Sequence, residues 1–98
     1  MTPKIQSVHF DADKKLISFI NEKVAKLGQF HDGIIDTDVI LRLDNASTTD
    51  NKTAEIKLNL KGSQLFAKKQ CTTFEEAVDT AVDALRTQLQ KRKDKVAG

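Results

Sequence analysis

Apolar residues in the first third of the chain change from strand-like alternation to helix-like spacing. Residues 4–10 alternate apolar and polar side chains, which predicts a short first strand. From Leu16 the apolar positions are 16, 20, 24 and 27, the i, i+4 spacing of one helix face. Asp11 and Asp13 precede this stripe as candidate N-caps, and Gly28 follows it, so we expect the helix to end there.

Three further strands with period-two alternation are predicted before the last helix. They span residues 34–43, 54–60 and 64–70. The polar segment 44–51 separates the first two of these strands and offers no residue for a core. The sequence Lys61-Gly62-Ser63 is a hairpin signal between the last two.

The last helix has the clearest sequence pattern in the chain. Thr73 and Glu76 form a capping box, with a hydroxyl at the N-cap and a carboxylate three residues later. This pattern predicts an amphipathic helix from about residue 74 to the low 90s. The apolar stripe behind the cap consists of Phe74, Ala77, Val78, Ala81, Val82, Leu85 and Leu89.

The predicted elements follow the order β-α-β-β-β-α within 98 residues, so we expect residues 1–98 to form a single domain. The β-α-β start needs a right-handed crossover if its strands are parallel. Each amphipathic helix has one apolar face to bury. We therefore predict an α+β fold in which both helices pack on one face of a four-stranded sheet.

Composition narrows the class of protein. Hydrophobic residues make up 39% of the chain and charged residues 31%, which is typical of a soluble globular protein. No apolar run approaches the ~20 residues of a membrane helix, and the first residues lack the apolar core of a signal peptide. The one cysteine, Cys71, agrees with a reducing compartment. We expect a cytoplasmic protein that does not contact a membrane.

Catalytic patterns are scarce in the sequence. It contains no phosphate-cradling glycine loop, no H-E-x-x-H and no paired CxxC. His9 and His31 have no further ligands at the spacing of a metal site. Cys71 lies beside the cap of the last helix, and we interpret it as a small, inert side chain rather than a reactive thiol. We therefore expect no enzyme activity, metal, cofactor or small-molecule substrate.

Positive charge is concentrated at the C-terminal end. Residues 86–98 hold five Lys/Arg and one Asp, a net charge of +4, whereas residues 1–85 hold eleven basic and thirteen acidic residues, a net charge of −2. Cations at the end of an amphipathic helix are a typical footprint for phosphate. Helices on one side of a sheet would bring further cations onto a common ridge. The candidate phosphate-binding residues are Lys23, Lys26, Lys68, Lys69, Arg86, Lys91, Arg92, Lys93 and Lys95.

The same cations also have a plain structural explanation. Basic residues near a helix C-terminus complement its dipole by about 0.3–1 kcal/mol each, so the pattern alone leaves nucleic-acid binding and a solvated face equally open. With five Phe and no Tyr or Trp, stacking on single-stranded bases is not an obvious mode. Recognition of the RNA backbone and shape suits the composition better.

Three blocks of sequence, in order and at these spacings, resemble a known family. The first is Lys23-Val-Ala-Lys26-Leu27, similar to the family's K-x-x-K-L segment, and it continues into the strand at 39–43. The second covers the hairpin strands at 54–58 and 62–67. The third runs from Phe74 to Lys95. Over nearly its whole length the chain resembles the short-form ribosome hibernation-promoting factors, relatives of the ribosome-associated inhibitor.

The resemblance implies a fold similar in topology to double-stranded-RNA-binding domains. It also implies a non-enzymatic protein that binds rRNA of the small ribosomal subunit in the mRNA and tRNA channel and blocks translation under stress or in stationary phase. The resemblance maps the rRNA contacts first to Lys23, Lys26, Lys91, Arg92, Lys93 and Lys95, and then to Lys68 and Lys69. The family usually has an arginine at the position where this chain has Thr87. Arg86 lies one residue earlier, about 100° round the helix from that position. The chain ends at Gly98, so we expect the long form's dimerising domain to be absent and the protein to be a monomer off the ribosome.

Two other functions stay open from the residues. The first is a generic double-stranded-RNA-binding domain, although Glu75 and Glu76 put acid where such domains place lysines. The second is a regulator that contacts a protein partner through an acidic sheet face. Affinity for free RNA duplex, or a salt-resistant complex with a protein, would distinguish them.

Overall fold

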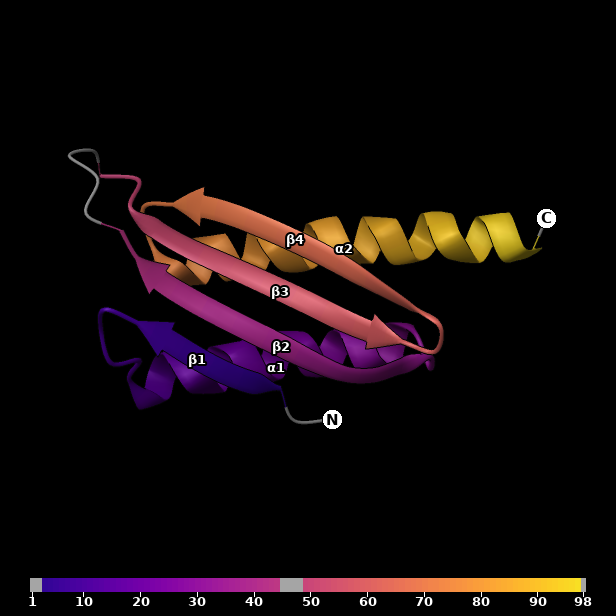
Figure 1. Ribbon diagram of the computed structural model, residues 1–98, viewed down its shortest axis with the longest axis horizontal. Coiled ribbons are helices and arrows are strands. Elements are labelled where there is room, and N and C mark those ends of the chain that lie inside the picture. The colour runs from indigo at the N-terminus through magenta and orange to yellow at the C-terminus, as the bar shows by residue number, and fades with distance from the viewer. Residues whose placement is uncertain (1–2, 45–48, 98) are drawn as a thin grey trace.

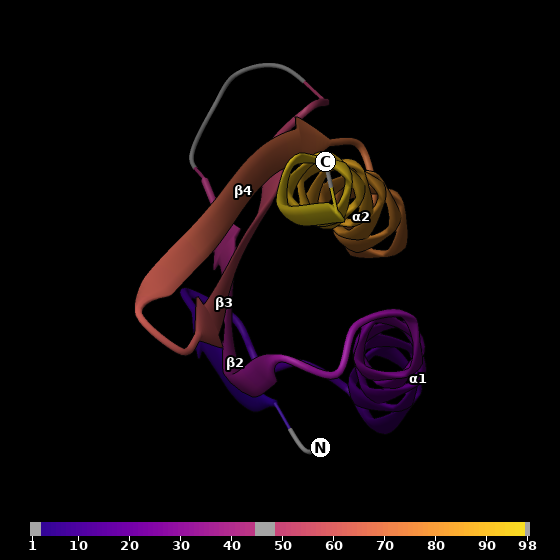
Figure 2. The same cartoon turned by 90° about the vertical axis from the view of Figure 1, so that its right-hand side faces the viewer.

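A computed structural model of the protein describes residues 3–44 and 49–97, with side chains of the last helix as far as Arg92. Figure 1 shows an open sheet with both helices behind it, and Figure 2 confirms that the two helices lie on the same face. The predicted order β-α-β-β-β-α and the α+β layering are therefore confirmed. The elements are β1 (Lys4–Val8), α1 (Lys14–Phe30), β2 (Ile34–Leu43), β3 (Lys52–Leu60), β4 (Ser63–Cys71) and α2 (Phe74–Ala97).

The sheet has the strand order β1-β2-β3-β4, with β1 parallel to β2 and the other neighbours antiparallel. Alternation decides which side chains reach the helices, because successive residues of a strand point to opposite faces. The inward positions of the two central strands are apolar and fully buried, as in Val39 and Leu41 of β2 and Ile56 and Leu58 of β3. Burial of each such side chain stabilises the fold by about 1.5–3 kcal/mol.

Both helices bury the apolar stripe that their spacing predicts. In α1 the buried residues are Leu16, Ile20, Val24 and Leu27. In α2 the stripe is buried from Ala77 to Leu89. The capping predictions also hold, because the Asp13 carboxylate accepts a hydrogen bond from Leu16 N at 2.8 Å and the Thr73 hydroxyl accepts one from Glu76 N at 3.1 Å. The Lys61-Gly62 turn joins paired Leu60 and Ser63, with Gly62 at φ 80°, as expected of a tight hairpin.

Four predicted boundaries were wrong by two residues or more. The third strand begins at Lys52 rather than at residue 54. The first strand ends at Val8, because His9 adopts a positive φ of 70° and turns the chain. Phe10 therefore lies in the following loop, where its ring stacks on Phe74 at 4.4 Å between centroids. This stack ties the start of α1 to the start of α2.

The first helix does not end at Gly28 but continues to Phe30, and His31 N donates to Leu27 O at 3.0 Å. Glycine in a helix costs up to about 1 kcal/mol, and the Phe30 side chain offsets this by packing against the core. The last helix extends past the low 90s to Ala97. No apolar stripe marks its final turns, but Gln, Lys and Arg are good helix formers.

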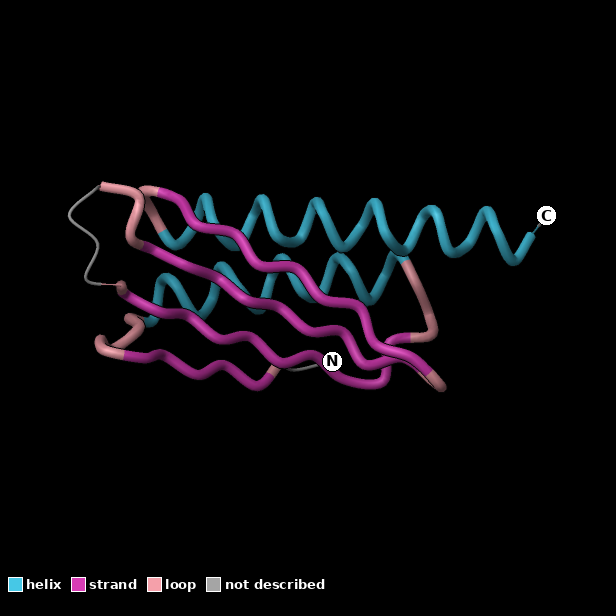
Figure 3. Tube along the Cα trace, turned by 45° about the horizontal axis from the view of Figure 1, so that its top comes forward, coloured by secondary structure: helices cyan, strands magenta, loops and turns pink. Residues whose placement is uncertain are grey.

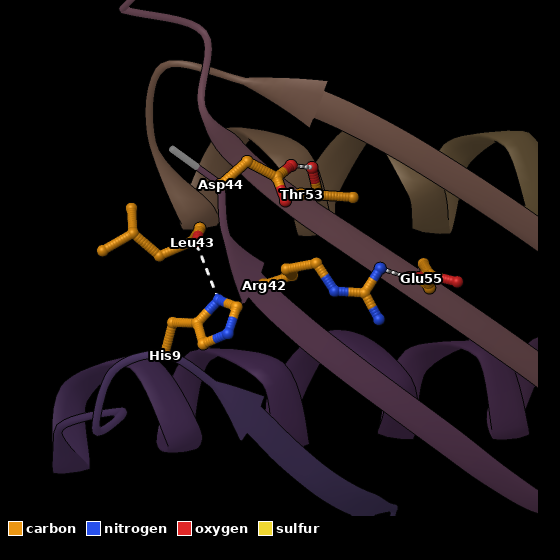
Figure 4. Close-up of polar contacts among 6 residues, drawn as sticks. All are labelled: His9, Arg42, Leu43, Asp44, Thr53 and Glu55. Atoms are coloured by element: carbon orange, nitrogen blue, oxygen red, sulfur yellow. Dashed lines mark hydrogen bonds and ion pairs between the residues drawn. The ribbon is translucent and has the colours of Figure 1, made fainter. Parts of the chain in front are cut away.

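The outer face of the sheet carries a polar network where β2 ends and β3 begins. Thr53, only 1% exposed, donates its hydroxyl to the Asp44 carboxylate at 2.8 Å, which satisfies a buried polar group (Figure 4). Beside it the Arg42 guanidinium pairs with Glu55 at 3.2 Å, and the His9 ring contacts Leu43 O at 3.4 Å (Figure 4). Within the described ranges 3–44 and 49–97, no helix is long and apolar enough to cross a membrane.

Candidate nucleic-acid interface

The two helices run side by side in the same direction, so both C-terminal ends lie at one end of the molecule (Figures 1 and 3). A groove of about 380 Å³ lies between them and is called the interhelix groove below. Its α1 side consists of Lys23, Lys26, Leu27, Gln29 and Phe30, and its α2 side of Asp79, Val82, Asp83 and Arg86.

Helix geometry explains why these residues meet. The sequence places Phe19, Lys23, Lys26 and Phe30 at i, i+4, i+7 and i+11, a single stripe beside the buried face of α1. The same spacing relates Asp79, Asp83, Arg86 and Gln90 on α2. Two stripes at the border of two buried faces come together when the helices pack in parallel.

The inner part of the groove is electrically balanced. The Lys23 ammonium lies 2.7 Å from the Asp79 carboxylate and 5.4 Å from the centre of the Phe19 ring. The hydrogen bond to Asp79 raises the pKa of Lys23 above its ordinary value of 10.5, and the charges of Asp79, Asp83 and Glu22 act in the same direction. Lys23 is therefore a cation whose charge an internal carboxylate already offsets.

The outer part of the groove has a different composition. Here the Arg86 guanidinium lies over the Phe30 ring, 5.4 Å from its centre. A second hollow of about 440 Å³ continues the groove past this pair, and its lining residues are Phe30, Arg86, Thr87, Gln90 and Lys91. No acidic side chain is among the described residues that line it. Lys26, Lys91 and Arg92 are exposed and form no ion pair with another described side chain.

The structure thus brings together four of the predicted cations along the groove: Lys23, Lys26, Arg86 and Lys91. Arg92 is exposed on the same helix one residue further on. Lys93 and Lys95 belong to the helical backbone of α2, but their side chains lie outside the described part of the chain. The C-terminal part of α2 projects past the sheet (Figure 1).

The two predicted cations on β4 lie on opposite faces of the sheet. Ala67 of β4 is buried against the helices, so Lys69 lies on the same face and Lys68 on the opposite face. Lys68 is exposed and pairs in register with Glu55. The expectation that Lys68 joins the helical ridge is wrong, because the strand period sends neighbouring residues to opposite sides.

The outer face of the sheet is not acidic, which corrects the premise of the protein-partner hypothesis. Its positions alternate in charge across strands: Lys4 lies opposite Asp38, which lies opposite Lys57. The charged residues at outward positions of the four strands are Lys4, Asp36, Asp38, Arg42, Glu55, Lys57 and Lys68. One exposed aromatic residue, Phe66 at 50%, lies among them.

His9, His31 and Cys71 hold structural positions in this fold. The His31 ring accepts a hydrogen bond from Gly33 N at 3.0 Å just after α1, and Cys71 is half-buried at the end of β4. Among the described residues, no group of three or more His, Cys, Asp or Glu side chains is arranged to hold a metal ion.

Residues 4–97 match the model of the family described as sigma 54 modulation protein / S30EA ribosomal protein. The chain belongs to this family. Curated relatives in the family include the ribosome hibernation promoting factor of Escherichia coli K12, 29% identical over 96 residues that cover 98% of this chain and 97% of the relative. A relative of the same name from Pseudomonas putida is 25% identical and covers 97% of this chain and 89% of its own length.

Solved structures of two relatives have the same fold. The N-terminal domain of Thermus thermophilus Protein Y has a TM-score of 0.79 and 25% identity, and the match covers 93% of this chain and 98% of that domain. A ribosomal subunit interface protein from Coxiella burnetii has a TM-score of 0.83 over 96% of this chain and 99% of its own, at 21% identity. The second similarity concerns the fold alone.

Sequence reasoning did not assign Phe30, Asp79 and Asp83 to the interhelix groove, or Gln90 to the hollow that continues it. A signal for them was present, because they complete the two i, i+4, i+7, i+11 stripes that contain Lys23 and Arg86. The signal becomes meaningful only when the two helices are known to be neighbours.

Proposed function

We propose that this protein is a ribosome hibernation factor that binds rRNA of the small ribosomal subunit in the mRNA and tRNA channel and blocks translation under stress. Family membership and the printed names of the curated relatives support this role. The single structural observation that carries it is the cluster of exposed cations at the outer end of the interhelix groove, where no described lining residue is acidic.

The proposed mechanism is occlusion by a preformed body. Lys26, Arg86, Lys91 and Arg92 contact rRNA phosphates, together with Lys93 and Lys95 further along α2. The folded domain then fills space that mRNA and tRNA need. The protein makes and breaks no covalent bond in this mechanism. We also propose that residues 1–98 act as one domain and that the protein is a monomer in the cytoplasm when off the ribosome.

Sedimentation of stationary-phase lysate through sucrose gradients at low and high salt tests the proposal directly. We expect the protein to migrate with small-subunit particles at low salt and to leave them at high salt. With about six phosphate contacts, affinity falls roughly 1,000-fold between 50 and 200 mM salt, because binding releases counterions from RNA. Protein that stays at the top of the gradient in both salts would contradict the proposal.

A pair of double variants separates a local interface from general charge attraction. Lys91→Glu with Arg92→Glu reverses two exposed cations of α2, and Lys14→Glu with Lys15→Glu makes the same charge change at the far end of α1. We expect the first double variant to bind purified small subunits on the order of 100-fold more weakly, because each reversal removes one phosphate contact and adds repulsion. The second should bind nearly as well as wild type. Equal losses in both variants would mean that net charge alone drives binding.

A further inference from the structure

We propose that the hollow at the outer end of the interhelix groove holds one unpaired RNA base, stacked on the Arg86–Phe30 pair, with a neighbouring phosphate on Lys91. This inference rests on the proposed function, because it names the part of the RNA that the same surface takes. The chain's lack of Tyr and Trp favours recognition of the RNA backbone alone. The geometry of this hollow indicates an additional contact with a base.

The position of Arg86 is not explained by the helix dipole. Favourable effects of cations on a helix dipole are confined to the last turn, and α2 continues to Ala97, eleven residues further on. No described carboxylate forms an ion pair with Arg86, although Asp83 lines the same groove. Its guanidinium instead lies 5.4 Å from the centre of the Phe30 ring. The aromatic ring therefore holds an exposed, planar cation at the mouth of the hollow.

A guanidinium held over an aromatic ring is a platform for a nucleobase. Unpaired bases of RNA stack on aromatic rings and on the planes of arginine side chains. The hollow has a mostly apolar lining and a volume of about 440 Å³, within the range of ~300–1,000 Å³ that holds small organic ligands. A base in a duplex cannot enter it, because its faces are covered by neighbouring base pairs.

The positive charges around the hollow favour a nucleotide over an uncharged apolar ligand. Lys91 lines the hollow, and Lys26 lies in the adjoining part of the groove. Both ammonium groups are exposed and unpaired with any described acid, so a phosphate next to the stacked base meets positive charge. An uncharged apolar segment would gain nothing from these cations, whereas RNA presents both a π-face and a phosphate.

The test compares two single-stranded RNAs of six nucleotides, one with bases and one made entirely of abasic nucleotides. Both carry the same phosphates, so their affinities differ only through the bases. We expect the full-length protein to bind the base-bearing strand about tenfold more tightly, the contribution of one stacked base. NMR resonances of the Phe30 ring should shift with the base-bearing strand. Equal affinities for the two strands, or no shift at millimolar RNA, would overturn the inference.

Three variants locate the effect. Phe30→Leu keeps an apolar side chain without a π-face, and Arg86→Lys keeps the charge without the plane. Both should reduce the tenfold preference to nearly one. Phe66→Leu, a matched change at the exposed aromatic residue of the opposite face, should leave the preference intact. Arg86 is exposed, so its variant remains informative if Phe30→Leu disturbs the fold.

The outcome is separable from that of the proposed function. Small-subunit binding without a preference for base-bearing RNA would leave the hibernation role standing and reject the base site. A preference for base-bearing RNA without subunit binding would do the reverse.

Discussion

The helix-bearing surface and the outer face of the sheet both carry several cations, but they differ in what lies beside each one. On the sheet, Lys4 and Lys57 flank Asp38, and Arg42 pairs with Glu55 at 3.2 Å. At the outer end of the interhelix groove, Arg86 and Lys91 have no acid among the described residues that line their hollow. The placement of acids, rather than the number of cations, therefore makes one surface attractive to phosphate.

The difference follows from the geometry of the two kinds of element. Side chains on neighbouring strands are held about 4.5–5.5 Å apart, so like charges repel directly and opposite charges are favoured as neighbours. The last turns of α2 project past the sheet and past the end of α1 (Figure 1). Among the described residues that line the hollow at this end, none is acidic. A projecting helix end can thus carry cations without the facing acids that the register of the sheet supplies.

Removing the two acids of the interhelix groove, Asp79 and Asp83, should have the largest effect on the difference between the two surfaces. Asp79→Asn with Asp83→Asn frees the Lys23 ammonium and extends the uncompensated positive surface inward. We expect affinity for a random RNA duplex to rise about tenfold, because one to two further phosphates can be neutralised. Filter-binding or fluorescence titration at fixed salt measures it.

A control with the same type of change is Asp11→Asn, which removes one exposed acid outside the groove. It should change duplex affinity less than twofold. If the groove variant also stays within twofold of wild type, the inner carboxylates do not limit the basic surface.

Charge reversal on the sheet should have a smaller effect. We expect Lys57→Glu with Lys68→Glu to leave small-subunit affinity within about twofold of wild type, because both residues project from the face opposite the helices. Isothermal titration with purified subunits checks this. A loss comparable to that of the Lys91 and Arg92 reversal would place the outer face in the interface and restore Lys68 to the binding set.

The smallest expected effect concerns a single proton. Asp79→Asn should lower the pKa of Lys23 toward its ordinary value, because the hydrogen bond from Lys23 to that carboxylate is the chief cause of the raised pKa. NMR titration of the Lys23 side chain measures the shift. Since the pKa is raised in the folded state, the pair stabilises the fold at neutral pH and loses this contribution only as pH rises above 10.5. An unchanged Lys23 pKa would mean that the ion pair does not persist in solution.

Periodic patterns in the sequence determined the elements and the layering of this protein. The apolar positions of both helices, the Asp13 and Thr73 caps and the Gly62 turn are local features, because each depends on residues within a few positions along the chain. The wrong boundaries at Phe10 and Gly28 have different causes. The positive φ of His9 ends the first strand, whereas contacts of Phe30 with the core carry the first helix past Gly28. The core contacts join residues that are distant along the chain, so the sequence does not show them.

The candidate site was predictable only in part for the same reason. Composition and position in the sequence identified Lys26, Lys91 and Arg92 as candidate phosphate-binding residues. They did not show which of these residues lie on one surface. Only the tertiary structure decided that Asp79 offsets Lys23, that Phe30 supports Arg86 and that Lys68 faces away. Charge and ring contacts act over a few ångströms in space, whereas the paired residues lie 56 positions apart in both groove contacts. The packing of α1 beside α2 is what turns two separate helix stripes into one surface.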